Sequence, residues 1–246
     1  RLVEELSSER GIIYFQDRDG KLVPVALNKI EKTLVAVPRE IEDAEGAALW
    51  VARNFAADQE EILQKISNRE DPYEILVKKI DTDQGERLKD DLPRGLHFEE
   101  EQRRSYPHGT LGAHLTGFVS REDIEEEGRY GLERFYERDL SGQKGFLDGA
   151  KDAAGFWVAL GRSIIRPPQN GSALVLGADY NIQLKAEEVL ERTREKWNAA
   201  SGMVLVMDPS SGQIRALAGS PAFDPNNFNN EKNFSVFLNN TVESMY

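Results

Sequence analysis

The sequence predicts an α+β fold, and three stretches carry that prediction. Residues 202–220 read as two short strands around the turn Asp208-Pro209-Ser210-Ser211-Gly212. In such a turn proline presets φ and a late glycine adopts the left-handed conformation. Residues 10–26 read as a second hairpin around Asp19-Gly20, and residues 179–198 have the apolar spacing of an amphipathic helix. Antiparallel hairpins together with helices indicate an α+β domain.

The chain between these stretches contains further strands and helices. Residues 33–37 read as a strand that Pro38 ends. Residues 41–66 read as two helices, the second with Asp58 as its N-cap. Residues 73–80 alternate in polarity like a strand.

The second half of the chain has a similar mixture of patterns. Residues 128–142 predict a helix, because apolar residues recur at helical spacing at Leu132, Phe135, Tyr136 and Leu140. Residues 144–176 are rich in glycine, with strand-like pieces at 155–160 and 172–176. The helix at 179–198 has Asp179 as its N-cap, and its predicted buried stripe is Ile182, Ala186, Val189, Leu190, Thr193 and Trp197.

Composition excludes several classes of protein. The net charge of −12 argues against nucleic-acid binding, because neutralising phosphates requires an excess of Lys and Arg. The absence of cysteine rules out disulfides and thiolate metal sites. No window approaches the roughly 18 apolar residues of a membrane-spanning helix, and no signal peptide is visible.

Two features could suggest a metal site or acid–base chemistry, but simpler interpretations are favoured. Glu99-Glu100-Glu101 lies in an extended polar segment, where neighbouring side chains point to opposite faces, so we expect a solvated surface. His108 and His114 could be metal ligands or a general base. His114 lies on a largely apolar helical face with Leu111 and Phe118, which favours a hydrogen-bonded structural histidine. We therefore predict no metal and no cofactor.

Several stretches resemble class B penicillin-binding proteins, in the order found in that family. Arg10-Gly11 and the hairpin after it are similar to R-G-x-I-x-D-R-x-G-x-x-L-A, and Gly131-Leu132-Glu133 resembles G-x-E-x-x-Y. Residues 208–226 resemble D-P-x-T-G-x-I-x-A followed by P-x-F-D-P-N. The text R-x-Y-P-x-G-x-x-A-x-H-x-x-G-F-V is matched at Arg104, Tyr106, Pro107, Gly109, His114, Gly117, Phe118 and Val119.

The resemblance implies a particular domain organisation. Residues 1–176 would be an elongated N-terminal pedestal, also called the dimerisation domain. Residues 177–246 would be the first helix and β-hairpin of a serine transpeptidase domain, with a small departure from the family text at Gly177-Ala178. In the family the motif Y-E-P-G-S-x-x-K follows, and its serine is acylated. The chain is expected to lack S-x-x-K, and therefore to contain no catalytic residue and to be inactive alone.

The resemblance also implies roles for individual residues. Arg10, Arg18, Arg104 and Glu133 would form buried polar ties between subdomains, because a buried charge must be paired. The remaining motif positions are Gly11, Tyr106, Pro107, Gly109, His114, Gly117, Asp208 and Gly212.

Partners and location follow from the same resemblance. The parent protein would cross-link peptidoglycan, bind β-lactams only through the missing domain, and contact a SEDS-type glycosyltransferase and other cell-wall synthesis proteins. It would lie outside the cytoplasm, in the periplasm or at the outer face of the membrane, anchored by an N-terminal transmembrane helix absent here. It could act in division or in elongation. The alternatives are an extracytoplasmic interaction module and a glycan-binding module.

Overall fold

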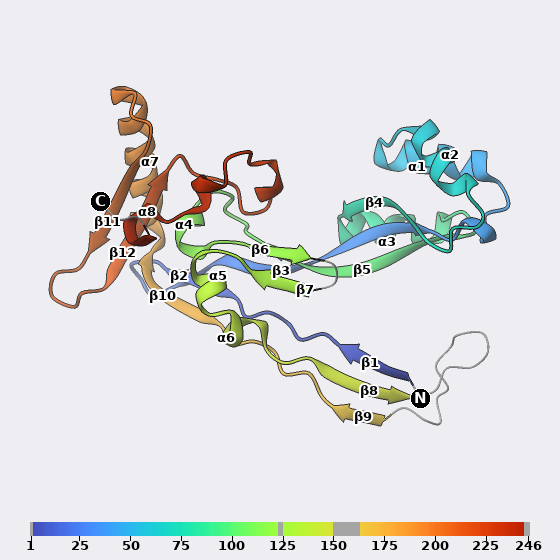
Figure 1. Cartoon of the computed structure of the whole chain (residues 1–246), viewed down its shortest axis with the longest axis horizontal. Helices are drawn as coiled ribbons and strands as arrows, with labels where there is room; N and C mark the ends of the chain where they lie inside the picture. The colour runs from blue at the N-terminus through green and yellow to red at the C-terminus, as the bar shows by residue number, and fades with distance from the viewer. Residues whose placement is uncertain (1, 123–124, 150–162, 244–246) are drawn as a thin grey trace. The chain divides into compact units, whose positions relative to one another are not determined.

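The computed structural model describes residues 2–122, 125–149 and 163–243, which form two compact units (Figure 1). The larger unit consists of Arg1–Asn28 and Arg104–Tyr246, and the smaller unit is Lys29–Arg103. The chain passes from one unit to the other within β3 (Leu22–Ala36) and near the end of β5 (Leu96–Ser105).

The described strands of the larger unit pair in four groups. β2 (Ile13–Gln16) lies antiparallel to the first part of β3 and parallel to β10 (Leu174–Asp179). A separate antiparallel sheet has the order β1-β8-β9, and β6 pairs with β7 and β11 with β12. These other strands are β1 (Leu2–Leu6), β6 (Val119–Glu122), β7 (Glu125–Gly128), β8 (Gly145–Gly149), β9 (Ser163–Arg166), β11 (Gly202–Met207) and β12 (Ile214–Ser220).

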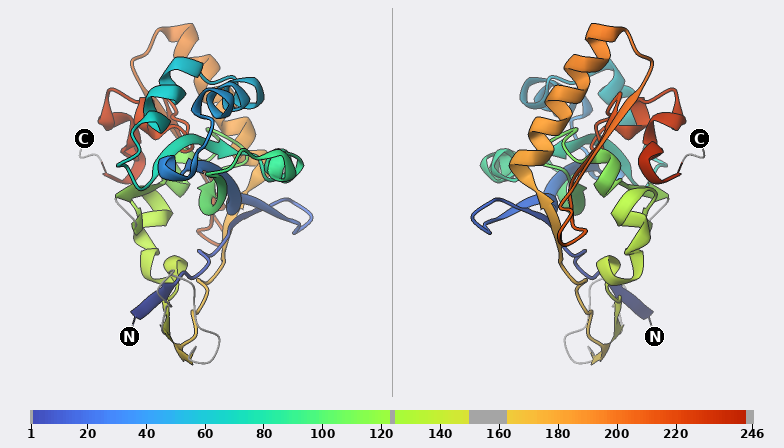
Figure 2. Two further views of the ribbon diagram at one scale, coloured as in Figure 1. Left: turned by 90° about the vertical axis from the view of Figure 1, so that its right-hand side faces the viewer. Right: turned by 90° about the vertical axis from the view of Figure 1, so that its left-hand side faces the viewer.

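The long helix α7 (Tyr180–Trp197) packs against β12 and β11, and the right-hand view of Figure 2 shows it running beside this hairpin. The other helices that the structure describes in the larger unit are short: α4 (Ala113–Thr116), α5 (Gly131–Phe135), α6 (Glu137–Ser141), α8 (Asn240–Glu243) and the 3₁₀ helices η4 (Phe228–Asn230) and η5 (Phe234–Phe237).

Aromatic rings dominate the core of the larger unit. Phe118 stacks on Phe228 and meets Phe223 and Phe237 edge to face. The core therefore joins the segment after β12 to the segment that precedes β6.

The smaller unit packs helices on a sheet. The second part of β3 pairs with β4 (Glu74–Ile80) and with β5. The helices are α1 (Ala44–Phe55), α2 (Gln59–Ser67), α3 (Thr82–Leu88) and the 3₁₀ helices η1 (Pro38–Glu40) and η2 (Lys89–Asp91). Its core consists of Leu34, Ala36, Ile41, Ala47, Ala48, Val51, Ile62, Ile66, Leu76, Ile80 and Leu96.

Local predictions are confirmed. The fold is α+β, Asp58 and Asp179 cap the N-termini of α2 and α7, and Gly212 has a φ of 74° in the hairpin turn. The segment with three consecutive glutamates is strand β5. Leu111, His114 and Phe118 are all buried, but they do not share a helical face, because α4 contains only His114 of the three. The strand predicted at 155–160 lies outside the described residues.

Three predictions about longer stretches were wrong. Residues 22–36 form one continuous strand of 15 residues rather than two separate strands. The helix predicted at 128–142 is broken at Tyr136 into α5 and α6, which leaves Phe135 79% exposed. On α7 the buried residues are Gln183 and Leu190, while Trp197 is 73% exposed, because the helix presents its first turns to β12 and its last turn to solvent.

The described residues contain neither a membrane-spanning helix nor a cluster of metal ligands. No helix among them has the length and hydropathy needed to cross a membrane. No three of their His, Asp and Glu side chains gather closely enough to hold a metal ion.

Candidate functional site

A buried network of charges lies in the larger unit, around Glu133 of α5. The Glu133 side chain is fully buried, with its Oε2 atom 2.7 Å from Arg10 Nε and its Oε1 atom 2.7 Å from Arg104 Nε. Arg10 also donates to the Glu133 backbone oxygen at 3.0 Å. The Glu133 carboxylate thus links Arg10, which lies shortly before β2, to Arg104, which lies near the end of β5.

Two residues that the sequence did not single out complete the network. Glu137 accepts two hydrogen bonds from the Arg10 guanidinium, at 3.0 and 2.7 Å, and one from the Gly128 backbone at 2.8 Å. Asn28 donates to the Arg10 carbonyl and accepts from Arg104. Glu137 follows Glu133 by four residues. On the single helix predicted at 128–142, this spacing would place both side chains on one face, so the sequence did contain a signal for Glu137.

The electrostatics of the network are balanced. Burial alone would lower the pKa of Arg10, but the hydrogen bond to Glu137 and the charge of Glu133 outweigh it and raise that pKa. Burial pushes the pKa of Glu137 upward, yet the hydrogen bond from Arg10 and the Gly128 amide hold it below its ordinary value. Both shifts favour the charged forms, so Arg10 and Glu137 form an ion pair, as a buried charge requires.

Tyr106 connects this network to the rest of the larger unit. Its hydroxyl contacts Glu133 Oε1 at 3.4 Å and accepts a hydrogen bond from the Val119 amide at 2.9 Å. Complete burial, together with the charge of Glu133, raises the pKa of Tyr106 well above its ordinary value. The Asn226 side chain pairs with both the N–H and the C=O of Tyr106, at 2.9 Å each, as a neighbouring strand would.

The prediction that Arg18 is a buried tie was wrong. Its side chain is 84% exposed and lies 3.7 Å from the equally exposed Asp19 at the tip of the β2–β3 hairpin. Arg10 and Arg18 look alike in the sequence, but only Arg10 is brought to Glu133, which is 123 residues away along the chain.

His114 of α4 is a second centre of contacts within the larger unit. Its ring is largely buried, and Nε2 lies 3.0 Å from the Val236 carbonyl, so Nε2 carries the hydrogen. Burial lowers the pKa of His114. The backbone oxygen of His114 accepts from Asn239 Nδ2 at 3.2 Å. A hydrogen-bonded structural histidine fits this geometry, and His108 instead packs against Tyr180.

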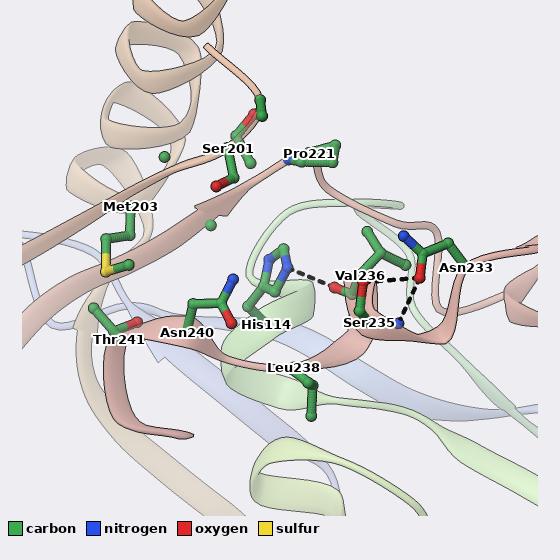
Figure 3. Close-up of a pocket in the computed structure, with 14 residues that line it drawn as sticks. His114, Ser201, Met203, Pro221, Asn233, Ser235, Val236, Leu238, Asn240 and Thr241 are labelled. Carbon is green, nitrogen blue, oxygen red and sulfur yellow. Dashed lines mark hydrogen bonds between the residues drawn. The ribbon is translucent and has the colours of Figure 1, made fainter. Parts of the chain in front are cut away.

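A pocket of about 230 Å³ lies beside the His114 ring (Figure 3). It is bounded by the start of β11, the end of β12 and the segment that contains η5 and α8. Besides the imidazole, the polar side chains that line it are hydroxyl and amide groups without a formal charge: Ser201, Ser220, Asn233, Ser235, Asn240 and Thr241.

One known protein family matches the part of the chain that contains these residues. The family described as Penicillin-binding Protein dimerisation domain matches residues 5–176, which is most of the chain. The chain belongs to this family. Both the charge network and His114 lie within the matched part of this dimerisation-domain protein.

Individual relatives match beyond the dimerisation domain. A probable peptidoglycan D,D-transpeptidase, PenA of Neisseria gonorrhoeae, is 32% identical over 226 residues, which is 91% of this chain. Peptidoglycan D,D-transpeptidase FtsI of Escherichia coli is 31% identical over 92% of this chain. The chain spans 38% of the length of each. A solved complex between Penicillin-Binding Protein PBP2 and MreC of Helicobacter pylori has the same fold, with a TM-score of 0.69 at 21% identity, over 92% of this chain and 44% of that one.

The other motif positions of the dimerisation-domain chain have mostly local roles. A side chain at Gly11 would place its Cβ 1.9 Å from the Ser172 carbonyl oxygen, so this position needs glycine. Pro107 is exposed in the turn before α4. Asp208 accepts hydrogen bonds from Ser210 and Ser211 within the hairpin turn, which lower the pKa of Asp208 to about 2.

The expectation that the chain lacks S-x-x-K was wrong as a statement about the sequence. The pattern occurs once, at Ser141 to Lys144, but the structure does not support a nucleophile there. An S-x-x-K serine and lysine need one helical turn between them. Here Gly142 has a φ of 70° and ends α6, and Lys144 pairs with Glu5 at 3.1 Å. The lysine is thus engaged elsewhere.

Gln183 and Glu187 connect α7 to its surroundings, and neither was predicted. The fully buried Gln183 amide bonds to both the N–H and the C=O of Leu217 in β12, at 2.9 and 2.8 Å. Glu187 Oε1 accepts from Gln183 Nε2 and from the Gly112 amide, at 2.7 Å each. Burial nevertheless raises the pKa of Glu187.

The raised pKa of Glu187 predicts a pH-dependent effect on stability. A carboxyl group with a folded-state pKa above its unfolded value stabilises the fold at low pH, and this contribution is lost as pH rises. Glu187→Gln should therefore gain stability relative to the wild type between about pH 4 and pH 7. Urea unfolding at both pH values measures this.

The neighbouring residue provides a control of opposite sign. The hydrogen bond from Lys185 lowers the pKa of the exposed Glu188. Glu188→Gln should therefore lose stability relative to the wild type over the same pH range. If both variants change in the same direction, the interpretation of Glu187 is wrong.

Proposed function

We propose that this chain is the non-catalytic N-terminal portion of a penicillin-binding protein that cross-links peptidoglycan stem peptides. The supporting observation is that similarity to D,D-transpeptidases extends over 226 residues, beyond the dimerisation-domain match at 5–176. In this proposal residues 1–176 form the pedestal, and residues 177–246 begin the transpeptidase domain with α7 and the β11–β12 hairpin.

The chemistry would be serine acyl transfer. A serine of the full protein attacks the carbonyl of a D-Ala-D-Ala stem peptide, releases the terminal D-Ala, and passes the acyl group to an amine of a second stem peptide. The nucleophile needs a neighbouring lysine and an oxyanion hole. The residues described above supply neither. In this proposal the pedestal positions the transpeptidase domain.

Partners and location are proposed from the same relatives. PBP2 of Helicobacter pylori forms a complex with MreC. We expect this pedestal likewise to contact cell-wall synthesis proteins outside the cytoplasm, among them a SEDS-type glycosyltransferase.

A fluorescent penicillin tests the catalytic part of the proposal. The full-length protein that contains this chain should form a denaturation-resistant labelled band, and replacing the serine of Y-E-P-G-S-x-x-K by alanine should abolish it. Residues 1–246 alone should remain unlabelled. An unlabelled full-length protein would favour the interaction-module or glycan-binding alternative. A labelled 1–246 fragment would show that the nucleophile lies within this chain.

A further inference from the structure

His114 contacts several separate parts of the chain that follow the dimerisation-domain match. Its ring lies against Gly219 at the end of β12, where an added Cβ would be 3.0 Å from the ring atoms. The ring also meets Phe223 edge to face, with centroids 5.3 Å apart. Nε2 donates to the Val236 carbonyl in η5, and the backbone oxygen accepts from Asn239. One residue of the matched region thus contacts the path from β12 to α8.

Asn239 transmits this contact to the start of α8. While its Nδ2 atom donates to His114, its Oδ1 atom accepts from the Thr241 backbone at 3.2 Å. The Asn239 backbone N–H donates in turn to Glu243 Oε2 at 2.7 Å, which closes a reciprocal cap. The Asn239 amide therefore links the start of α8 directly to α4, in addition to the contacts of α8 with β11 and β12.

The imidazole is suited to holding the segment in one position. It is 7% exposed and packed on two sides, so the ring has little freedom to rotate. With Nε2 protonated, it satisfies the carbonyl of Val236, and Figure 3 shows this nitrogen pointing at that carbonyl. Val236 is partly buried, so its carbonyl without this donor would favour a different path for the η5 segment.

We propose that His114 is a positioning residue for the transpeptidase reaction. By holding Val236 and Asn239 it fixes residues 233–243, which in the proposed function lead directly to the nucleophilic serine. The inference rests on that proposed function. A displacement of about 1 Å at a reacting group can cost on the order of a hundredfold in rate. His114 therefore sets the rate of acylation without touching the substrate.

Variants at 114 separate positioning from folding. His114→Phe keeps a ring of similar shape but has no donor for the Val236 carbonyl. His114→Gln keeps a donor nitrogen at nearly the place of Nε2. His108→Phe is the matched control, because His108 lies in the same motif and its ring packs against Tyr180.

The experiment is stopped-flow acylation of the full-length protein by a fluorescent penicillin over a range of concentrations. The amplitude reports the fraction of folded protein, and the limiting rate constant reports the positioning of the nucleophile. His114→Phe should lower the limiting rate constant by about tenfold or more at unchanged amplitude. His114→Gln should recover most of the rate, and His108→Phe should match the wild type.

The outcomes distinguish this inference from the proposed function. If the wild-type protein is not acylated, the proposed function is wrong and the inference falls with it. If the wild type is acylated and His114→Phe has the same rate constant as His108→Phe, only the inference is overturned. Should His114→Phe fail to fold, Asn239→Ala decides: a slower limiting rate supports the inference and a wild-type rate overturns it.

Discussion

Replacing Glu133 by alanine should lower the free energy of unfolding by about 3–5 kcal/mol, because two buried guanidinium groups lose their shared carboxylate. Arg10 and Arg104 are 6% and 2% exposed in their side chains, so water cannot replace the lost partner. Arg10 would keep Glu137, whereas Arg104 would keep only the neutral Asn28 among the partners described here. Urea unfolding of the purified protein measures the loss.

Two further variants make this test specific. Glu195→Ala removes an exposed glutamate from α7 and should change stability by less than about 0.5 kcal/mol. Adding Arg104→Met to Glu133→Ala removes one of the unpaired cations and should restore part of the loss. Equal effects of Glu133→Ala and Glu195→Ala would show that the network contributes nothing to stability.

Gly117→Ala should cost about 4 kcal/mol, from strained backbone and from a steric clash. Gly117 has φ 72° and ψ −154°, a combination that is essentially restricted to glycine. An added Cβ would lie 1.8 Å from the Tyr130 carbonyl oxygen, which no side-chain rotation can relieve. Thermal and urea unfolding both report this loss.

Gly109→Ala is the matched control in the same motif. Its φ of 59° is also left-handed, but an added Cβ would meet no atom within 4 Å. Its cost should therefore be about 1 kcal/mol, from the backbone alone. A Gly117→Ala loss as small as that of Gly109→Ala would mean that α4 and Tyr130 separate easily.

Arg10 is buried and Arg18 is exposed, a difference that the sequence around each residue did not predict. Each arginine is near a hairpin strand, and the family resemblance offered both as buried ties. Arg10 reaches Glu133 only because the chain folds back over 123 residues. The same holds for Gln183, whose partner Leu217 is 34 residues away, and whose burial contradicts the apolar stripe expected on α7.

The sequence by itself determined the features that depend on a few neighbouring residues. Asp58 and Asp179 cap the helices that follow them, and Asp208 with Gly212 forms the turn of the β11–β12 hairpin, since their partners lie within four residues. Only the tertiary structure decided which charges are buried and which helix face is covered. Burial is a property of the whole packing, because a side chain loses water only when distant segments meet around it. Glu133, Gln183 and His114 therefore acquire their roles from contacts that no local pattern encodes.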